Sequence, residues 1–398
     1  MRYKIKKIPI RDVPALYDIL CQSYPFLKFD SNCLNWLTNS VQKDEGDPFF
    51  GAYFKGILVG GMRPYNFKMN ISSHVVNALG LGSLCTHFLY RKQGIATNLI
   101  KYYFNYAQKR EAMVGVLYPF QFEFYKYFGF GHGSSFYQFR VKPVCFPKSS
   151  KRHLSFYTLA DRTELIKYHH KIYKNFHGMT DRLDIFKKGD HTIIHREKGA
   201  IKGYFNYKIV RNDDTANPGY DLIINNIYYD SGEVLKQFYT FLNSLQDQVK
   251  VVVLNTFDKN LAYLLKNPST DKANNFASDY LLETNSTALG VMYKIFDPKK
   301  ACEEFVSERV INSNLNLKIK LCKDGKNKEF ELGVKRNKAT ATLKIDLSIS
   351  DFSSLFMGAI SFNSLLSLGL AKISDQKFAG IINEIFKTKE LPVCNIYF

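Results

Sequence analysis

The sequence lacks any cysteine or histidine pattern that would build a disulfide framework or a metal centre. Its seven cysteines are scattered along the chain, and none forms a Cys-x-x-Cys pair. An odd number of isolated cysteines argues against a disulfide scaffold and against a structural zinc site. His191 and His195 are four residues apart, but no third ligand lies nearby. We expect them to be ordinary surface or core residues, and we predict no metal.

A long hydrophobic run is also missing. The basic start of the chain leads into no apolar core of the kind that a signal peptide requires. The longest uncharged run, residues 352–371, contains five serines and one asparagine. These polar residues favour an amphipathic core helix over a membrane span. We expect a cytoplasmic protein that does not use a membrane.

Acidic residues are few relative to basic ones, with 36 Asp and Glu against 55 Lys and Arg, giving a formal charge of +19. Such a balance can indicate nucleic-acid binding. The lysines are dispersed, however, and no arginine-rich block or nucleic-acid module occurs. We predict a basic surface that attracts an anionic cofactor, and no nucleic-acid partner.

The length of the chain, 398 residues, suits two or three domains that each bury a core. A segment with two prolines and several basic residues, 142–151, suggests one boundary. The pattern changes again near Met292, where alternating strands follow. We predict domains at 1–146, 147–290 and 291–398.

One stretch of the first domain predicts an anion site. The apolar run Leu84–Leu89 reads as a strand, the basic turn Arg91–Ala96 follows, and an amphipathic helix extends to about Arg110. A helix N-terminus presents unpaired amides and the positive end of a dipole. Gly94 and Ala96 lack bulk, so a pyrophosphate could approach the backbone closely.

This stretch resembles the acyl-CoA signature of the GNAT N-acetyltransferases, which is Arg-x-x-Gly-x-Ala after a strand. The next predicted strand, Glu111–Leu117, is followed by a Phe-Tyr-x-x-Phe-Gly-Phe segment at residues 124–130. That segment resembles the GNAT helix that carries the catalytic tyrosine. The whole chain looks most like the Eis family (enhanced intracellular survival acetyltransferases).

The resemblance implies an α/β (α+β) fold with two tandem GNAT-like mixed sheets. The second sheet is expected to be degenerate and to bind no cofactor, because Ser231-Gly232-Glu233 opens its helix with a carboxylate that would repel a pyrophosphate. At the C-terminus we expect a sterol-carrier-like α+β domain, with three hairpin strands between Leu315 and Ile345 and a mostly helical segment from Ile349 to Leu370. The family further implies a homo-oligomer, commonly a hexamer.

The resemblance also implies acetyl-CoA as co-substrate and assigns residues to it. The backbone that would hold the thioester and pantetheine belongs to Leu84, Cys85 and Thr86. The turn that would hold the pyrophosphate consists of Arg91, Lys92, Gln93, Gly94, Ile95 and Ala96. Tyr125 matches the general acid that protonates the departing thiolate. Two alternatives stay open for this region: Tyr125 is an aromatic core residue, or the register selects Tyr127.

The acceptor is less determined. In Eis-like enzymes the terminal carboxylate, here on Phe398, returns to the active site to orient or deprotonate the amine. Phe26 and Tyr397 occupy places that hold acidic residues in aminoglycoside-acetylating members, and Trp36 matches a pocket residue or is a core tryptophan. A primary amine of an aminoglycoside, polyamine or lysine side chain fits equally. A non-enzymatic lipid or small-molecule carrier or sensor is the alternative function.

Overall fold

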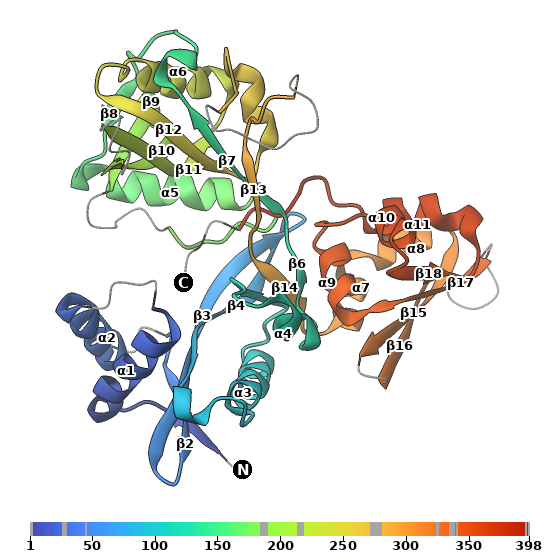
Figure 1. Ribbon diagram of the computed structural model, residues 1–398. Coiled ribbons are helices and arrows are strands. Elements are labelled where there is room, and N and C mark those ends of the chain that lie inside the picture. Colours follow the sequence, from blue (N-terminus) through green and yellow to red (C-terminus); the bar gives the residue numbers. More distant parts are fainter. Residues whose placement is uncertain are drawn as a thin grey trace.

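The computed structural model of the protein describes residues 3–25, 30–43, 46–183, 190–212, 219–270, 281–323, 326–333, 339, 341–394 and 396. These residues form three lobes, each built around its own sheet (Figure 1). No helix within the described ranges is both long and apolar enough to cross a membrane.

The first sheet has the order β1-β2-β3-β4-β5-β14-β6 in the described part of the chain. Its strands are β1 (Lys4–Lys7), β2 (Phe50–Phe54), β3 (Ile57–Ile71), β4 (His74–Thr86), β5 (Val114–Leu117), β6 (Gly131–His132) and β14 (Met292–Ile295). Its helices are α1 (Val13–Ser23), α2 (Ser31–Lys43), α3 (Ile95–Lys109) and α4 (Phe122–Tyr127). The apolar face of α3 is buried, as its spacing predicts, through Ile95, Leu99 and Tyr103.

The second sheet has the order β13-β7-β12-β11-β10-β9-β8. Its strands are β7 (Ser135–Val141), β8 (Leu154–Phe156), β9 (His191–Glu197), β10 (Ala200–Arg211), β11 (Tyr220–Tyr229), β12 (Val249–Thr256) and β13 (Ser286–Leu289). The helices are α5 (Arg162–Tyr173) and α6 (Gly232–Asn243). The prediction of two tandem mixed sheets with helices is therefore confirmed.

The two sheets exchange strands, which the predicted divisions at 146 and 290 did not anticipate. β7 follows the first sheet in the chain but pairs with β12 and β13 of the second. β14 follows the second sheet but pairs with β5 and β6 of the first. Both strands are short, and nothing in their sequences identifies the strands with which they pair. The sequence therefore predicted the strands but not the sheets to which they belong.

The third sheet has the order β16-β15-β17-β18. Its strands are β15 (Leu315–Lys323), β16 (Lys326–Gly333), β17 (Ala341–Ser348) and β18 (Ala371–Ile373), and its helices are α7 (Pro298–Phe305), α8 (Ser307–Asn312), α9 (Ile349–Phe356), α10 (Phe362–Ser367) and α11 (Ala379–Phe386). β15 and β16 form the predicted hairpin. β17 instead pairs with β15 in parallel, so the prediction of a third hairpin strand was wrong.

Helix α9, which contains Ser350 and Ser353, joins the third lobe to the first. The Ser350 hydroxyl donates to the carbonyl of Phe130 at 3.0 Å. The Ser353 hydroxyl accepts a hydrogen bond from the Ile295 amide of β14 at 3.2 Å. Because both hydroxyls have hydrogen-bond partners, they can be buried where α9 packs between the two lobes.

His177 joins all three lobes. Its Nδ1 accepts from the amide of Ser72 in the first lobe at 3.0 Å, and its Nε2 donates to the carbonyl of Met357 in the third at 3.0 Å. Its own carbonyl accepts from the amide of Val393 at 2.7 Å. Burial lowers the pKa of the His177 imidazole, so the neutral form occupies this junction.

We expect the junction to loosen at mildly acidic pH. An unfolded histidine binds a proton below a pKa of about 6.5, whereas the buried His177 does not, so its contribution is complete above that pH and falls as the pH falls. The melting temperature should therefore drop between about pH 7.5 and 5.5. His177→Gln should lower the melting temperature at pH 7.5 and reduce this dependence. The part that remains comes from other buried histidines, since burial also lowers the pKa of His169, to about 4. His170→Gln, at an exposed position, is the control and should leave the dependence unchanged.

Candidate active site

β4 and β5 of the first sheet diverge, and we use the word cleft for the region between their separated ends. The two strands pair in parallel only from Ala78 opposite Val114 to Gly80 opposite Val116. β4 continues to Thr86, whereas β5 ends at Leu117. Over the last six residues of β4, no described strand lies on the side away from β3.

A bulge marks this open part of β4. Ser83 and Leu84 together lie opposite Met62, since the pairing passes from Gly82–Arg63 to Cys85–Gly61. Ser83 has a φ of +52°, the left-handed conformation that a bulge residue often adopts. The bulge changes which backbone groups of β4 point toward the cleft.

The hydrogen bonds around the bulge define those groups. The amide of His87 donates to the Val59 carbonyl of β3 at 3.0 Å. Because backbone groups alternate along a strand, those of Cys85 also face β3, whereas those of Thr86 face away from it. Of the three residues expected to hold a thioester and pantetheine, Leu84 and Thr86 direct backbone groups to the open side. Cys85 is buried, and burial raises the pKa of its thiol to about 12.

The end of α1 occupies this open edge, which the sequence did not predict. The Tyr24 hydroxyl donates to the Leu84 carbonyl at 3.0 Å. The Ser23 hydroxyl accepts from the Thr86 amide at 3.4 Å, and the Gln22 side chain accepts from the Phe88 amide at 3.0 Å. These three residues lie past the last apolar position of α1, so helical periodicity gave no signal for them.

The turn into α3 has the geometry that an anion requires. Gly94 caps the helix with a φ of +80°, and no side chain caps the first amides of α3. A Cβ at Gly94 would meet only the Asn98 amide nitrogen, at 3.8 Å, so the left-handed backbone is what favours glycine here. Arg91 and Lys92 are exposed beside the turn, and the Arg91 guanidinium lies 4.2 Å from the centre of the Phe88 ring. Uncapped amides and two cations form an anion-binding corner.

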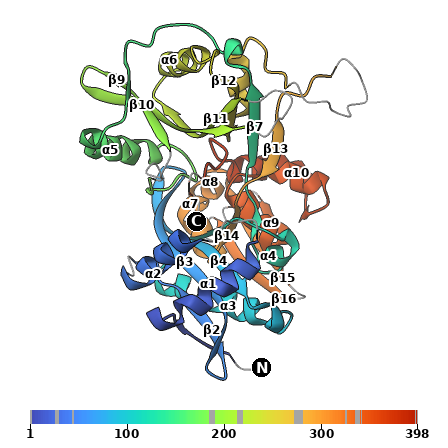
Figure 2. The same cartoon turned by 60° about the vertical axis from the view of Figure 1, so that its left-hand side comes forward.

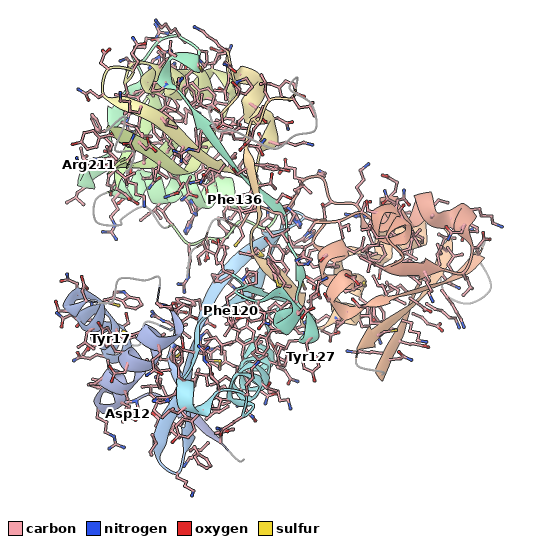
Figure 3. All side chains as sticks on the ribbon, viewed as in Figure 1. Asp12, Tyr17, Phe120, Tyr127, Phe136 and Arg211 are labelled. Atoms are coloured by element: carbon pink, nitrogen blue, oxygen red, sulfur yellow. The ribbon has the colours of Figure 1, made fainter. Side chains whose placement is uncertain are left out.

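Tyr125 and Tyr127 lie on opposite faces of α4. Tyr127 is 56% exposed and points away from the sheet (Figure 3), whereas Tyr125 is 3% exposed. The ring of Tyr125 packs against Phe120 and Phe130, so it is part of the aromatic core. Burial raises the pKa of Tyr125 well above its usual value. The pKa of Tyr24 is also raised. Burial is the largest cause, and Cys85 and then Tyr125 raise it further.

Trp36 lies at the surface, so the alternative of a core tryptophan was wrong. It is 51% exposed, and the Arg63 guanidinium lies 5.6 Å from its ring centre. The same guanidinium stacks on Phe49 at 4.7 Å and on Tyr65 at 4.9 Å. A hollow of about 460 Å³ opens beside this group, lined by Asn32, Asn35, Trp36, Asn39, Ser40, Lys43 and Arg63.

The C-terminal segment runs from the third lobe back to the first. The Tyr118 hydroxyl, directly after β5, donates to the Ile396 carbonyl at 2.8 Å. Ile396 is buried in the core that contains Val116 of β5. Phe26, Tyr397 and Phe398 lie outside the described residues. Among the described residues, no group of three histidine, cysteine, aspartate or glutamate side chains could hold a metal ion.

Comparisons with known proteins agree with this geometry. Residues 4–133 match a family described as an acetyltransferase (GNAT) domain, and residues 169–280 match a second family with the same description. No curated protein sequence matches the chain.

Solved structures share the fold over the whole length of the chain. A GCN5-related N-acetyltransferase from Anabaena variabilis is 18% identical, with complete coverage of both chains and a TM-score of 0.79. A probable N-acyltransferase from Enterococcus faecalis, a conserved protein of unknown function, is 16% identical, with complete coverage of both and a TM-score of 0.76. Eis1 from Mycobacterium abscessus is 15% identical over 99% of this chain and 100% of that one, with a TM-score of 0.74.

Proposed function

We propose that this protein, which carries two GNAT acetyltransferase domains, is an Eis-like N-acetyltransferase that moves an acetyl group from acetyl-CoA to a primary amine. The observation that carries the proposal is the cleft of the first sheet. It combines an open strand edge at Leu84–Thr86, an uncapped helix N-terminus at Gly94, and a buried tyrosine at 125. In this proposal the strand edge holds the thioester, the helix N-terminus holds the pyrophosphate, and the tyrosine protonates the leaving thiolate.

The turn at residues 91–96 suits the pyrophosphate. The amides at the start of α3 donate to its oxygens, and Arg91 and Lys92 neutralise its charge. The pantetheine arm pairs with the outward backbone groups of Leu84 and Thr86. Because Tyr24 and Ser23 already bond to these groups, the arm must displace or share their hydrogen bonds.

The reaction moves one acetyl group and two protons. The neutral amine attacks the thioester carbon, the C–S bond breaks, and the thiolate takes a proton from Tyr125. The amine loses its proton to a base. Since burial raises the pKa of Tyr125, its hydroxyl keeps the proton until a thiolate, equally deprived of water, develops beside it.

We assign the base or orienting group to the carboxylate of Phe398. The support is the anchoring of Ile396 by Tyr118 at the end of β5. Two further residues span at most about 7 Å. The proposal therefore requires the carboxylate to act within that distance of Ile396. We propose a small or lysine-like primary amine as the acceptor. It would enter the site beside Trp36 and Arg63.

Titration calorimetry with acetyl-CoA tests the proposal, with Gly94→Val as the sensitive variant. Valine forces the capping residue out of its left-handed conformation and disturbs the amides that hold the pyrophosphate. We expect the dissociation constant to rise roughly tenfold or more, about 1.4 kcal/mol. Gly56→Val is a matched control, because Gly56 also has a positive φ, +86°, and open space around it, but lies in the β2–β3 turn. Equal effects of the two variants, or no binding by the unaltered protein, would contradict the proposal.

Tyr125→Phe should reduce kcat by about 10²–10⁴-fold with acetyl-CoA affinity nearly unchanged, because only the proton donor is lost. The ring stays in place, so its packing against Phe120 and Phe130 is kept. Tyr127→Phe, on the exposed face of the same helix, should leave kcat unchanged. Thiol release under saturating amine measures both. A loss of affinity that parallels the loss of rate would favour the purely structural role of Tyr125.

Deleting Phe398, or appending a tag to it, should stop acetyl transfer while acetyl-CoA still binds. Both changes remove or displace the carboxylate, whereas an N-terminal tag does not. The two tagged proteins should be compared by thiol release at matched melting temperature. Similar rates would show that the base is another group.

A further inference from the structure

The second sheet contains a cleft of the same construction, which the proposed reaction does not use. β11 and β12 pair in parallel from Tyr220 opposite Val249 to Ile224 opposite Leu254 and then separate. β11 bulges at Asn225, because the pairing with β10 passes from Ile224–Tyr207 directly to Asn226–Asn206. The space between the separated strands is a cavity of about 200 Å³. It lies at the end of the sheet nearest the other lobes, where Phe136 is labelled (Figure 3).

Figure 2 shows α6 at the end of the molecule opposite to α3, and the N-terminus of α6 is what makes this cleft different from the first. The helix that follows β11 is α6, which occupies the place that α3 has in the first lobe. Its N-terminus is already capped, since the Ser231 hydroxyl accepts from the Val234 amide at 3.4 Å, and Glu233 lies in its first turn. Asp230 next to it pairs with Lys171 at 3.4 Å. The capped amide and the nearby carboxylates therefore disfavour a phosphate at this helix N-terminus.

The lining of the cavity selects against anions more generally. In a chain with a net charge of +19, no lysine or arginine is among the described residues that line it. Its one carboxylate belongs to Asp258. One oxygen of that carboxylate, Oδ1, accepts from the Asn260 amide at 2.8 Å.

Aromatic rings line the same cavity as this carboxylate. They come from four separate segments of the chain and belong to Phe136, Phe176, Tyr228, Tyr229 and Phe257. Phe136 and Phe257 pack edge to face, with ring centres 4.8 Å apart. Aromatic faces carry partial negative charge and attract cations, above all ammonium groups that are weakly hydrated.

Two buried polar side chains near the cavity have no partner within the described part of the chain. The Tyr239 hydroxyl on α6 is one of them. Burial is the main cause that raises the pKa of Tyr239. Tyr229 and Asp258, which both line the cavity, raise it further. The amide of Asn206, the register partner of the lining residue Asn226, is the other. Unpaired buried polar atoms are uncommon in folded proteins and often mark a place that water or a ligand completes.

We propose that this cavity binds a small organic cation, an alkylammonium or quaternary ammonium compound, between the aromatic rings and the Asp258 carboxylate. A cavity of about 150 Å³ holds a benzene-sized molecule, so this one suits a ligand of about ten non-hydrogen atoms or fewer. Val393 and Cys394 of the C-terminal segment form part of its wall. An occupant therefore touches the same segment that reaches β5 through Ile396.

Choline and its uncharged isostere 3,3-dimethyl-1-butanol test the proposal in titration calorimetry on the full chain. Choline should bind with one site per chain, and the isostere should bind at least about tenfold more weakly, because it fills the same volume without the charge. Asp258→Asn should weaken choline binding by a similar factor. Asparagine keeps the hydrogen bond to the Asn260 amide, so this variant should fold. Glu233→Gln removes a carboxylate from the same lobe outside the cavity and should have no effect.

The variant Trp36→Ala tests whether choline binds in the first lobe, at the proposed acceptor site, and not in the second cleft. If choline uses the second cleft, this variant should leave its affinity unchanged. A loss of affinity with Trp36→Ala, equal binding of choline and its isostere, or no binding at millimolar concentration would each overturn the proposal. None of these outcomes depends on acetyl-CoA binding. The choline titration therefore tests this proposal independently of the acetyltransferase assignment.

Discussion

The pairing of β14 with β5 and β6 is the interaction on which the three-lobed arrangement depends. A strand that follows the whole second lobe returns to fill the gap in the first sheet. Its amide at Ile295 then bonds to Ser353, which brings α9 and the third lobe against the same sheet. Because β14 leaves the first sheet directly into α7, the position of the third lobe follows from this one pairing. The return of the C-terminal segment past His177 closes the arrangement from the other side.

The two sheets show how one backbone geometry serves different chemistry. In both, a parallel pair separates beside a bulge and leaves a cleft. The first cleft ends at an uncapped helix with two cations, and the second at a capped helix with a carboxylate. The two clefts therefore differ in local charge and not in topology. The two clefts can be compared directly because they lie in two similar sheets of one chain.

The end of α1 shows a constraint specific to the first cleft. Gln22, Ser23 and Tyr24 satisfy backbone groups of β4 that would otherwise be exposed in an open cleft. A buried, unpaired carbonyl or amide costs about 1–3 kcal/mol, so these side chains stabilise the open edge. They therefore hold the strand edge open and at the same time occupy the outward backbone groups of Leu84 and Thr86.

The sequence by itself determined the local parts of the candidate site. The turn at 91–96 and the amphipathic helix after it depend on short-range rules of periodicity, capping and charge, and the structure has them where the sequence predicts. The tandem arrangement of two sheets was expected from the family resemblance, and the structure confirms it. Only the tertiary structure decided the exchange of β7 and β14, the parallel pairing of β17, the exposure of Trp36 and the partners of Gln22, Ser23 and Tyr24. Each of these depends on contacts between residues far apart in the chain. A strand or a polar side chain has many equally suitable partners in sequence, and the packing of the complete core selects one of them.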